Sequence, residues 1–478
     1  MALGQAPFDL WFVLLLGLIA AFVQILRIET VRNAAIFGGL LGTGYFATAL
    51  FWIVEPFFVD AETHAWMAPF ALVGLATGLA LFWAGAFAFA AWMRRWRLVA
   101  LAVSLTAAEA LRSYVLTGFP WAMPSQAFLD TPVMQWAAFG GQLGVLFGVC
   151  IMAAALAAIY ENRRRMAAIG VAFACAAVLW GGGQMLIPPL HVLDDRPVVR
   201  LVQPNAPQDQ KWNVAMMPFF LDRSVALSAA APLGAPPALT VWPETALPMF
   251  LREAAPALEH VAAVTGGRPL VAGIQRFDEG RFYNALILTD QTGQTTAVYD
   301  KHHLVPFGEY MPLPGLFKRI GIAGLAARAE GGYSAGAGPM PFDIPGLGRV
   351  LPLICYEAVF PQDLNRADFR ADWILHATND AWFGSWSGPY QHLAQARIRA
   401  IEQGLPVLRA ANTGVSAAID GAGRVVAALT LNETGFLDVP LPPPLRVTVY
   451  SRIGDWPLFV VLFCALAFCV LRARSESD

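Results

Sequence analysis

Charged residues are scarce in this sequence. Asp, Glu, Lys and Arg make up 14% of the 478 residues, whereas a soluble globular protein carries about a quarter. Lysine is limited to Lys211, Lys301 and Lys318, no long basic run is present, and the net charge is −2. These absences argue against nucleic acid as a partner, because its recognition requires clustered cations.

The shortage of charge is uneven along the chain. The first 190 residues and the C-terminal end are mostly apolar, whereas the middle has the composition of a soluble domain. That middle part is long enough for one sizeable core. We therefore expect N-terminal transmembrane helices over 1–190, about six spans in all. A globular domain over 191–444 and a C-terminal transmembrane helix with its tail over 445–478 follow.

Cysteine is also rare. Cys355 is the only cysteine of the globular part, and the other four lie in apolar stretches. Cys355 therefore has no disulfide partner in its own domain, and no pair of cysteines has the spacing of a metal site. On this evidence alone, Cys355 is either a small buried apolar residue or a reactive thiol.

Long apolar segments are abundant instead. Each has close to the ~20 residues that a helix needs to cross a bilayer, and together they would leave a soluble protein with too little polar surface. They cover residues 8–26, 34–54, 67–92, 98–117, 136–159, 166–189 and 456–471.

Basic residues cluster after alternate apolar segments. They follow the first, third, fifth and last segments, as Arg27, Arg32, Arg94, Arg95, Arg97, Arg163, Arg164, Arg165, Arg472 and Arg474. The loops around 55–66 and 118–135 contain neither Lys nor Arg. The positive-inside rule predicts that the basic loops and the C-terminal tail are cytoplasmic and that the globular domain lies outside.

One charged pair lies inside a predicted span. Glu109 and Arg112 are three residues apart, so they share a helix face and are able to pair. Charges inside a membrane are candidates for function. A structural ion pair near the outer end of the helix is the alternative.

The globular part contains short β-rich runs with helices between some of them, one of them predicted over Gln391–Gly404. This alternation predicts an α/β domain. The predicted strands are Val198–Gln203, Leu239–Trp242, Leu270–Ile274, Ala285–Thr289, Thr296–Tyr299, Val350–Ile354, Trp373–Thr378, Val407–Ala410 and Val415–Ile419.

Three chemically active side chains directly follow predicted strands: Glu244, Lys301 and Cys355. The carboxyl ends of sheet strands form the usual ligand crevice of α/β domains. A thiol is a strong nucleophile as its thiolate, a carboxylate accepts its proton, and an ammonium stabilises the oxyanion that follows. The backbone N–H of Tyr356 is a natural second oxyanion donor. These functions suffice for acyl transfer without a metal or cofactor.

Several motifs in chain order resemble the nitrilase (carbon-nitrogen hydrolase) superfamily and, more closely, the apolipoprotein N-acyltransferase family. The resemblance covers nearly the whole chain, including the order of helices, domain and helix. The motifs are Thr117–Trp121, Gln210–Trp212, Trp242–Glu244, Leu304–Tyr310, Cys355–Glu357, Asn379–Gly384, Gly388–His392 and Gly454–Leu458.

The resemblance implies an αββα sandwich outside the cytoplasm and a role for each matching residue. Glu244 is the general base, Lys301 the oxyanion stabiliser and Cys355 the nucleophile. The supporting or substrate-binding residues are Glu309, Tyr356, Glu357, Trp212 and Asn379, with Trp382–Gly384 in a loop beside the site. The family's first transmembrane helix has no counterpart in this chain, which leads us to expect a missing N-terminal span.

The resemblance also implies a reaction and its partners. A phospholipid would acylate Cys355, and the N-terminal diacylglyceryl-cysteine of an apolipoprotein would accept the acyl group, at the cell inner membrane and in a monomer. Ala246–Leu251 and Met311–Ala326 are apolar enough to enter the membrane interface. His302, His303 and His392 lack zinc spacing, so we expect no metal. A membrane-anchored amidase and a non-enzymatic lipoprotein-binding or transport scaffold are the alternatives.

Overall fold

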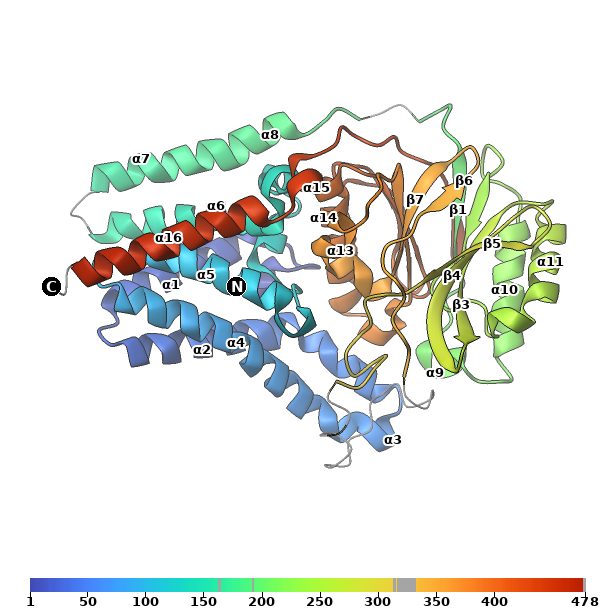
Figure 1. The fold of residues 1–478 in the computed structure, drawn as a ribbon, viewed down its shortest axis with the longest axis horizontal. Helices are drawn as coiled ribbons and strands as arrows, with labels where there is room; N and C mark the ends of the chain where they lie inside the picture. Colours follow the sequence, from blue (N-terminus) through green and yellow to red (C-terminus); the bar gives the residue numbers. More distant parts are fainter. Residues whose placement is uncertain (162–164, 191–192, 313–314, 316–331, 476–478) are drawn as a thin grey trace.

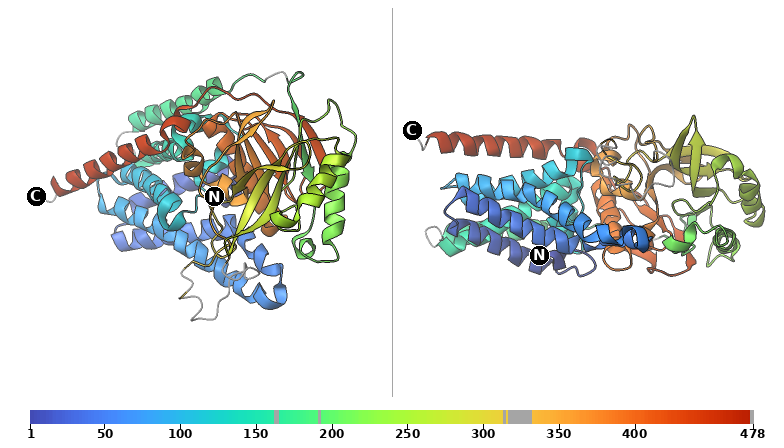
Figure 2. Two further views of the ribbon diagram at one scale, coloured as in Figure 1. Left: turned by 45° about the vertical axis from the view of Figure 1, so that its right-hand side comes forward. Right: turned by 90° about the horizontal axis from the view of Figure 1, so that it is seen from below.

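The computed structural model describes residues 1–161, 165–190, 193–312, 315 and 332–475. A helical bundle and a two-sheet domain lie end to end along the long axis of the molecule (Figure 1, Figure 2). The last helix returns from the two-sheet domain and runs along the bundle. The order of helices, domain and helix therefore follows the composition of the chain.

Every predicted apolar segment contains a helix of the bundle. The helices are α1 (Trp11–Arg27), α2 (Val31–Ala49), α4 (Ala68–Trp92), α5 (Arg97–Tyr114), α6 (Ala137–Ala158), α7 (Arg165–Ala176) with α8 (Gly183–Leu186), and α16 (Trp456–Ser475). The short helices α3 (Ala61–His64) and α15 (Val449–Ile453) complete this part.

Length and composition separate these helices into two groups. Among the described residues, 4 helices are long and apolar enough to cross a membrane. The number becomes 5 if α2 and the 3-10 helix η2 (Phe51–Phe58), bent by 48°, form one span. The two shorter apolar helices, Trp11–Arg27 and Trp456–Arg472, lie in the first and last segments that hydropathy predicts as spans.

Two six-stranded sheets form the second part. The first has the order β12-β1-β2-β3-β4-β5 and the second the order β11-β10-β9-β8-β7-β6. Their strands are β1 (Val198–Gln203), β2 (Leu239–Val241), β3 (Leu270–Asp278), β4 (Arg281–Thr289), β5 (Thr295–Asp300), β6 (Phe342–Ile344), β7 (Gly348–Ile354), β8 (Trp373–Thr378), β9 (Val407–Ala411), β10 (Ser416–Ile419), β11 (Val425–Leu429) and β12 (Gly435–Pro440).

Helices cover the outer face of each sheet, which completes an αββα sandwich. The helices α10 (Met217–Ala229) and α11 (Ala255–Val264) pack on the first sheet. The second sheet carries α13 (Pro361–Asn365) and α14 (Gly388–Gln403). The short helix α9 (Gln208–Lys211) lies near the site described below. Each predicted strand is present, and β6, β11 and β12 are additional.

Helix α14 separates the second sheet from the bundle (Figure 1). It begins with Pro389 in its first turn, where the missing N–H costs nothing, and ends at Gly404 with φ +63°. One face contacts the sheet core through Ala396 and Ala400. On the other side, Glu402 accepts a hydrogen bond from the N–H of Gln142 in α6 at 3.0 Å.

The structure reassigns one segment that the sequence placed at the membrane interface. In Ala246–Leu251, Leu247 is fully buried in the core beside the first sheet, and Met249 and Leu251 pack against the same core. Their apolar surface is thus used inside the domain. The other such segment, Met311–Ala326, lies for the most part outside the described residues.

Gly273 of β3 lies against the backbone that presents Glu244. A Cβ atom here would stand 2.3 Å from the Thr245 nitrogen, 2.4 Å from the Pro243 oxygen and 2.6 Å from the Glu244 Cα. Because backbone cannot give way, we expect Gly273→Ala to destabilise the fold by about 1–3 kcal/mol and to displace Glu244. Thermal unfolding and activity of the purified protein measure both. Gly234→Ala, in open space, is the control, and equal effects of the two substitutions would contradict this account.

Candidate active site

Three strand ends from two sheets converge on the site. Glu244 follows β2, Lys301 follows β5 and Cys355 follows β7. The three side chains are buried, with exposed fractions of 7%, 1% and 5%. The charges of Glu244 and Lys301 both act on the Cys355 thiol. The structure therefore brings the predicted triad together between the two sheets.

Lys301 is shared by two carboxylates. Its Nζ lies 2.9 Å from Oε2 of Glu309 and 3.5 Å from Oε1 of Glu244. Burial lowers the pKa of Lys301, but the two carboxylates outweigh burial, so the pKa is raised above its ordinary value. Glu309 also accepts a hydrogen bond from the N–H of Val305 at 2.8 Å. Glu309, which the sequence analysis expected to support Lys301, thus contacts it directly.

The Glu244 carboxylate is held from both sheets. Oε1 accepts a hydrogen bond from Nδ2 of Asn284 at 2.7 Å, and Oε2 accepts one from the N–H of Asn379 at 2.9 Å. Asn284 donates to Glu309 as well, at 3.0 Å. Since each oxygen of Glu244 has a donor, its orientation is set before any substrate arrives.

Two polar residues of this site were not predicted from the sequence. Asn284 is one of them, and nothing in its strand-like surroundings distinguishes it. The other is Lys211, whose buried Nζ donates to the Glu244 carbonyl oxygen at 3.0 Å and to Thr245 Oγ1 at 2.8 Å. Burial lowers the pKa of Lys211 to about 8. Two features of the sequence could have drawn attention to Lys211: it is one of only three lysines in the chain, and it belongs to the Gln210–Trp212 motif.

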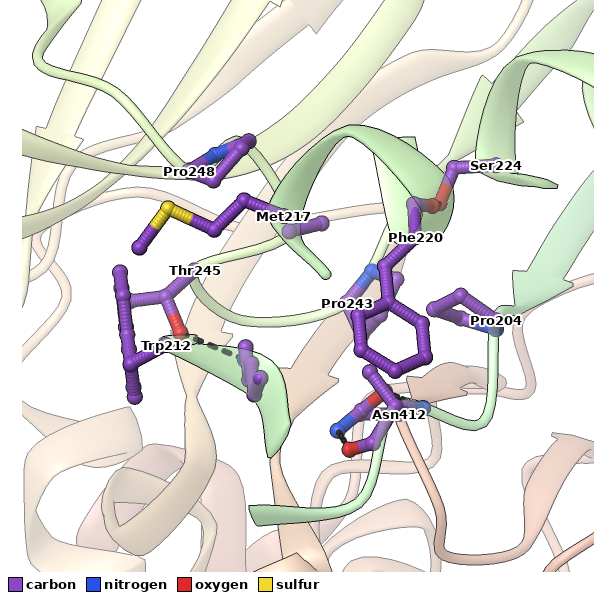
Figure 3. Close-up of a pocket in the computed structure, with 12 residues that line it drawn as sticks. Pro204, Trp212, Met217, Phe220, Ser224, Pro243, Thr245, Pro248 and Asn412 are labelled. Carbon is purple, nitrogen blue, oxygen red and sulfur yellow. Dashed lines mark hydrogen bonds between the residues drawn. The ribbon is translucent and has the colours of Figure 1, made fainter. Parts of the chain in front are cut away.

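Trp212 lies in a small pocket beside Glu244 rather than among the charges. Trp212, Met217 and Phe220 line this pocket (Figure 3). Pro243 and Thr245, the two sequence neighbours of Glu244, also line it. The Lys211 Nζ stands 5.8 Å from the centre of the Trp212 ring. This predicted residue therefore borders the site through a largely apolar wall.

Cys355 has an unusual backbone. Its φ is +49°, in the left-handed region that non-glycine residues rarely adopt. It begins the 3-10 helix η10 (Cys355–Val359), and N–H groups in the first turn of a helix have no partner inside it. Burial raises the pKa of the Cys355 thiol, Glu244 raises it further and Lys301 lowers it. At rest the sulfur is thus a neutral thiol.

Glu357 fastens the Lys301 strand end to the Cys355 strand end. It accepts hydrogen bonds from the N–H of Ile354 and of His302, both at 2.7 Å, and from the Tyr299 hydroxyl at 2.8 Å. It is fully buried. Tyr356 packs edge-on against His303 and Phe360. Glu357 thus acts on the geometry of the triad, and Tyr356 borders it.

The loop after β8 carries the remaining predicted residues. Asn379 bonds to Glu244 through its backbone, and its side chain bonds to Gln208 and Asn412 at 2.8 Å each. Further along, Phe383 packs edge-on against Trp52 and Trp121 of the bundle. This loop therefore joins the site to the helical bundle.

The histidines are held by acids and backbone. His302 and His303 lie beside Glu357 and Asp363, and His392 lies beside Asp380. Over the described part of the chain, no group of three or more His, Cys, Asp or Glu residues has the arrangement needed to hold a metal ion. These side chains act as hydrogen-bonding groups.

Comparison with known families matches both parts of the chain. Residues 1–155 match the model described as apolipoprotein N-acyltransferase N-terminal domain, and residues 199–447 match carbon-nitrogen hydrolase. Among solved structures, a CN-hydrolase superfamily protein from Xanthomonas campestris is similar to this chain, with 21% sequence identity. It has a TM-score of 0.37 and covers 57% of this chain and 97% of its own.

Curated relatives match over nearly the full length. The apolipoprotein N-acyltransferase of Rhodopseudomonas palustris is 39% identical over 501 residues, covering 99% of this chain and 93% of the relative. That of Brucella melitensis is 37% identical over 493 residues, covering 97% and 92%. This chain belongs to the apolipoprotein N-acyltransferase family.

Proposed function

We propose that this chain is a multi-pass enzyme of the cell inner membrane that N-acylates the N-terminal diacylglyceryl-cysteine of apolipoproteins. A membrane phospholipid is the acyl donor, and Cys355 carries the acyl group as a thioester between two half-reactions. Family membership supports the activity. The observation that carries the mechanism is the buried Cys355 thiol under the combined charges of Glu244 and Lys301.

In the first half-reaction, Cys355 Sγ attacks an ester carbonyl of the phospholipid while Glu244 takes the thiol proton. The neutral resting thiol requires this transfer during attack, because burial raises its pKa. The Lys301 ammonium and the Tyr356 N–H stabilise the oxyanion. The ester C–O bond then breaks, the departing lysophospholipid oxygen takes the proton from Glu244, and a thioester remains on Cys355.

In the second half-reaction, the α-amine of the apolipoprotein attacks the thioester. Glu244 accepts a proton from the attacking nitrogen, and the same two donors stabilise the second oxyanion. Collapse breaks the C–S bond, gives the amide and returns the sulfur as thiolate, which Glu244 reprotonates. Water is the competing acceptor, so the buried site favours transfer over hydrolysis by restricting water.

Lys301 keeps its charge through both steps. Glu309 contacts it at 2.9 Å, and the two nearby carboxylates raise its pKa despite burial. Glu309 is therefore a positioning residue that holds the ammonium in place and maintains its charge. The mechanism uses no cofactor, and one copy of the chain contains all of its groups.

Contacts at one end of the bundle support an outward-facing site. Arg27 donates to Tyr160 at the end of α6, and Arg97 donates to the Ile28 carbonyl at 2.7 Å. The chain segments that follow α1, α4 and α6 thus meet at one end. The C-terminal end of α16 also lies remote from the sheets (Figure 1). We place this end in the cytoplasm and the sheets in the periplasm.

Incubation with phospholipid tests the nucleophile. We expect mass spectrometry of the intact enzyme to show one added acyl group on Cys355, released by hydroxylamine as a thioester. Cys355→Ala should show none, because no other thiol lies among the charged residues. Cys464→Ala, which removes an exposed apolar-helix cysteine, is the control. An undiminished adduct on Cys355→Ala would rule out this nucleophile, and ammonia release from simple amides would favour the amidase.

Lys301→Met tests electrostatic support of the sulfur. Lys301 lowers the pKa of the Cys355 thiol, so removing the cation should raise that pKa and move the iodoacetamide alkylation profile to higher pH. Acylation should also slow, by roughly a hundredfold to a thousandfold as for loss of one oxyanion donor. Arg252→Met removes an exposed cation and should leave the profile in place. An unchanged profile for Lys301→Met would separate Lys301 from the nucleophile.

A labelling experiment in intact cells tests the orientation. In a Cys464→Ser background, His260→Cys on α11 should react with a membrane-impermeant maleimide added outside. Arg95→Cys, between α4 and α5, should react only after the cells are opened, since its basic loop faces the cytoplasm. Outside labelling of Arg95→Cys with protection of His260→Cys would reverse the assignment.

A further inference from the structure

Two sequence motifs and one charged pair have no role in the mechanism above. The motifs are Thr117–Trp121, between α5 and α6, and Gly388–His392, at the start of α14. The pair is Glu109 and Arg112 within α5. In the structure, all three belong to one continuous set of contacts that ends at the backbone of Cys355.

The contacts begin at the strained nucleophile. The carbonyl oxygen of Cys355 lies 3.0 Å from Nε2 of His376 and 3.1 Å from Nε2 of His392. A carbonyl oxygen has two lone pairs, and both rings lie within hydrogen-bond distance of it. A non-glycine residue at φ +49° persists only where its surroundings determine the conformation. The two histidines supply that constraint through their contacts with the Cys355 carbonyl oxygen.

Buried charges orient both rings. Arg409 Nη1 donates to His376 Nδ1 at 2.8 Å. Because a guanidinium only donates, the proton of His376 is on Nε2, facing the Cys355 carbonyl. His392 has Nδ1 2.8 Å from Oδ1 of Asp380, which also pairs with Arg409. Rotation of either ring would break a buried contact with a charged group, so the ring orientations are set by Asp380 and Arg409.

The bundle holds the helix that carries His392. The neighbouring Gln391 accepts hydrogen bonds through Oε1 from Nε1 of Trp121 at 2.8 Å and of Trp52 at 3.1 Å. Its Nε2 donates to the Ala49 carbonyl at 2.9 Å. The Trp121 ring also stacks on the His392 ring, with 5.4 Å between centroids and an interplanar angle of 27°. The stacking and the hydrogen bond place Trp121 against two consecutive residues of α14.

The intramembrane charged pair holds Trp121 in turn. Arg112 donates to the Trp121 carbonyl at 2.9 Å and to the Phe119 carbonyl. It pairs with Glu109, which accepts a hydrogen bond from Trp83 at 2.7 Å. Glu109, Arg112 and Trp121 are almost completely buried. The loop between them includes two non-glycine residues at positive φ, Leu116 at +55° and Thr117 at +75°, so the arginine stabilises an otherwise unfavourable conformation.

We propose that Arg112, Trp121 and His392 are positioning residues through which the membrane bundle sets the backbone geometry of the nucleophile Cys355. The proposal rests on the proposed function for the identity of the nucleophile. It makes the bundle a structural component of the active site as well as an anchor. Catalysis of the first half-reaction then depends on indole and guanidinium groups that never touch the substrate.

A double-mutant cycle in the full-length purified enzyme tests the coupling. Trp121→Phe retains an aromatic ring but loses the hydrogen bond to Gln391, and we expect it to slow acylation of Cys355 by roughly threefold to tenfold. His392→Leu removes the ring that lies against both the Cys355 carbonyl and Asp380, and it should slow acylation by roughly tenfold to a hundredfold. The double variant should be much less impaired than the product of the two effects. The kcat/KM for the acceptor should remain within about twofold, because the acceptor reacts only after Cys355 has been acylated.

Trp136→Phe is the matched control, because Trp136 also donates its indole N–H to a carbonyl, that of Val178, but lies outside the contacts. It should change acylation by less than about twofold and combine additively with His392→Leu. Equal effects of Trp121→Phe and Trp136→Phe, or independent effects of Trp121→Phe and His392→Leu, would overturn the proposal.

Iodoacetamide alkylation of Cys355 at one fixed pH separates this proposal from the proposed function. The reagent needs neither phospholipid nor apolipoprotein. If wild type forms no acyl adduct but its alkylation still shows coupling between Trp121 and His392, the function fails and the positioning holds. If wild type is acylated normally and the cycle is additive in both reactions, the positioning proposal fails alone. A Trp121→Phe protein that unfolds is replaced by Arg112→Lys, which retains the charge opposite Glu109.

Discussion

One buried ammonium organises the active site. Lys301 is almost inaccessible to water, and an isolated charge at such depth is unfavourable. Glu309 and Glu244 compensate it, and their own oxygens are satisfied by Asn284, Asn379 and Val305. Removing any member would leave a buried group without its partner. The site is therefore preorganised by the need to neutralise Lys301, and this preorganisation favours oxyanion stabilisation.

The same requirement links the two sheets. Glu244 and Lys301 belong to the first sheet, whereas Asn379 and Cys355 belong to the second. A hydrogen bond from the Asn379 backbone to Glu244 and those from His302 and Tyr299 to Glu357 cross between the ends of strands in different sheets. The sandwich is consequently fastened at the site itself. Catalytic geometry and sheet packing are consequences of the same polar contacts.

The bundle contributes more than attachment to a bilayer. Helix α14 lies between the second sheet and the bundle, and Gln391 in its first turn makes hydrogen bonds to three bundle segments. The acyl donor that we propose is itself confined to the membrane. Under this proposal, a nucleophile held from the membrane side keeps its sulfur in a fixed relation to the bundle that meets the donor.

The sequence alone determined the elements with strong local signals. Apolar runs predicted each of the long helices described in the bundle, because the bilayer requires continuous apolar length. Buried strands such as β1 and β8 were predicted residue for residue, since strands covered on both faces are mostly apolar. The three residues of β6 are too few to show that pattern, and β11 was missed although all of its residues are apolar.

The sequence predicted the triad, because each member directly follows a strand and matches a family motif, and the structure brings the three side chains together. Tertiary structure alone decided the support around it. Asn284 and Lys211 are ordinary residues until folding brings them to Glu244 from 40 and 33 residues away in sequence. Likewise Glu109 and Arg112 could be recognised as a pair from their spacing. Their contact with Trp121, and through it with His392 and Cys355, exists only because buried polar groups far apart in sequence must satisfy one another once water is excluded.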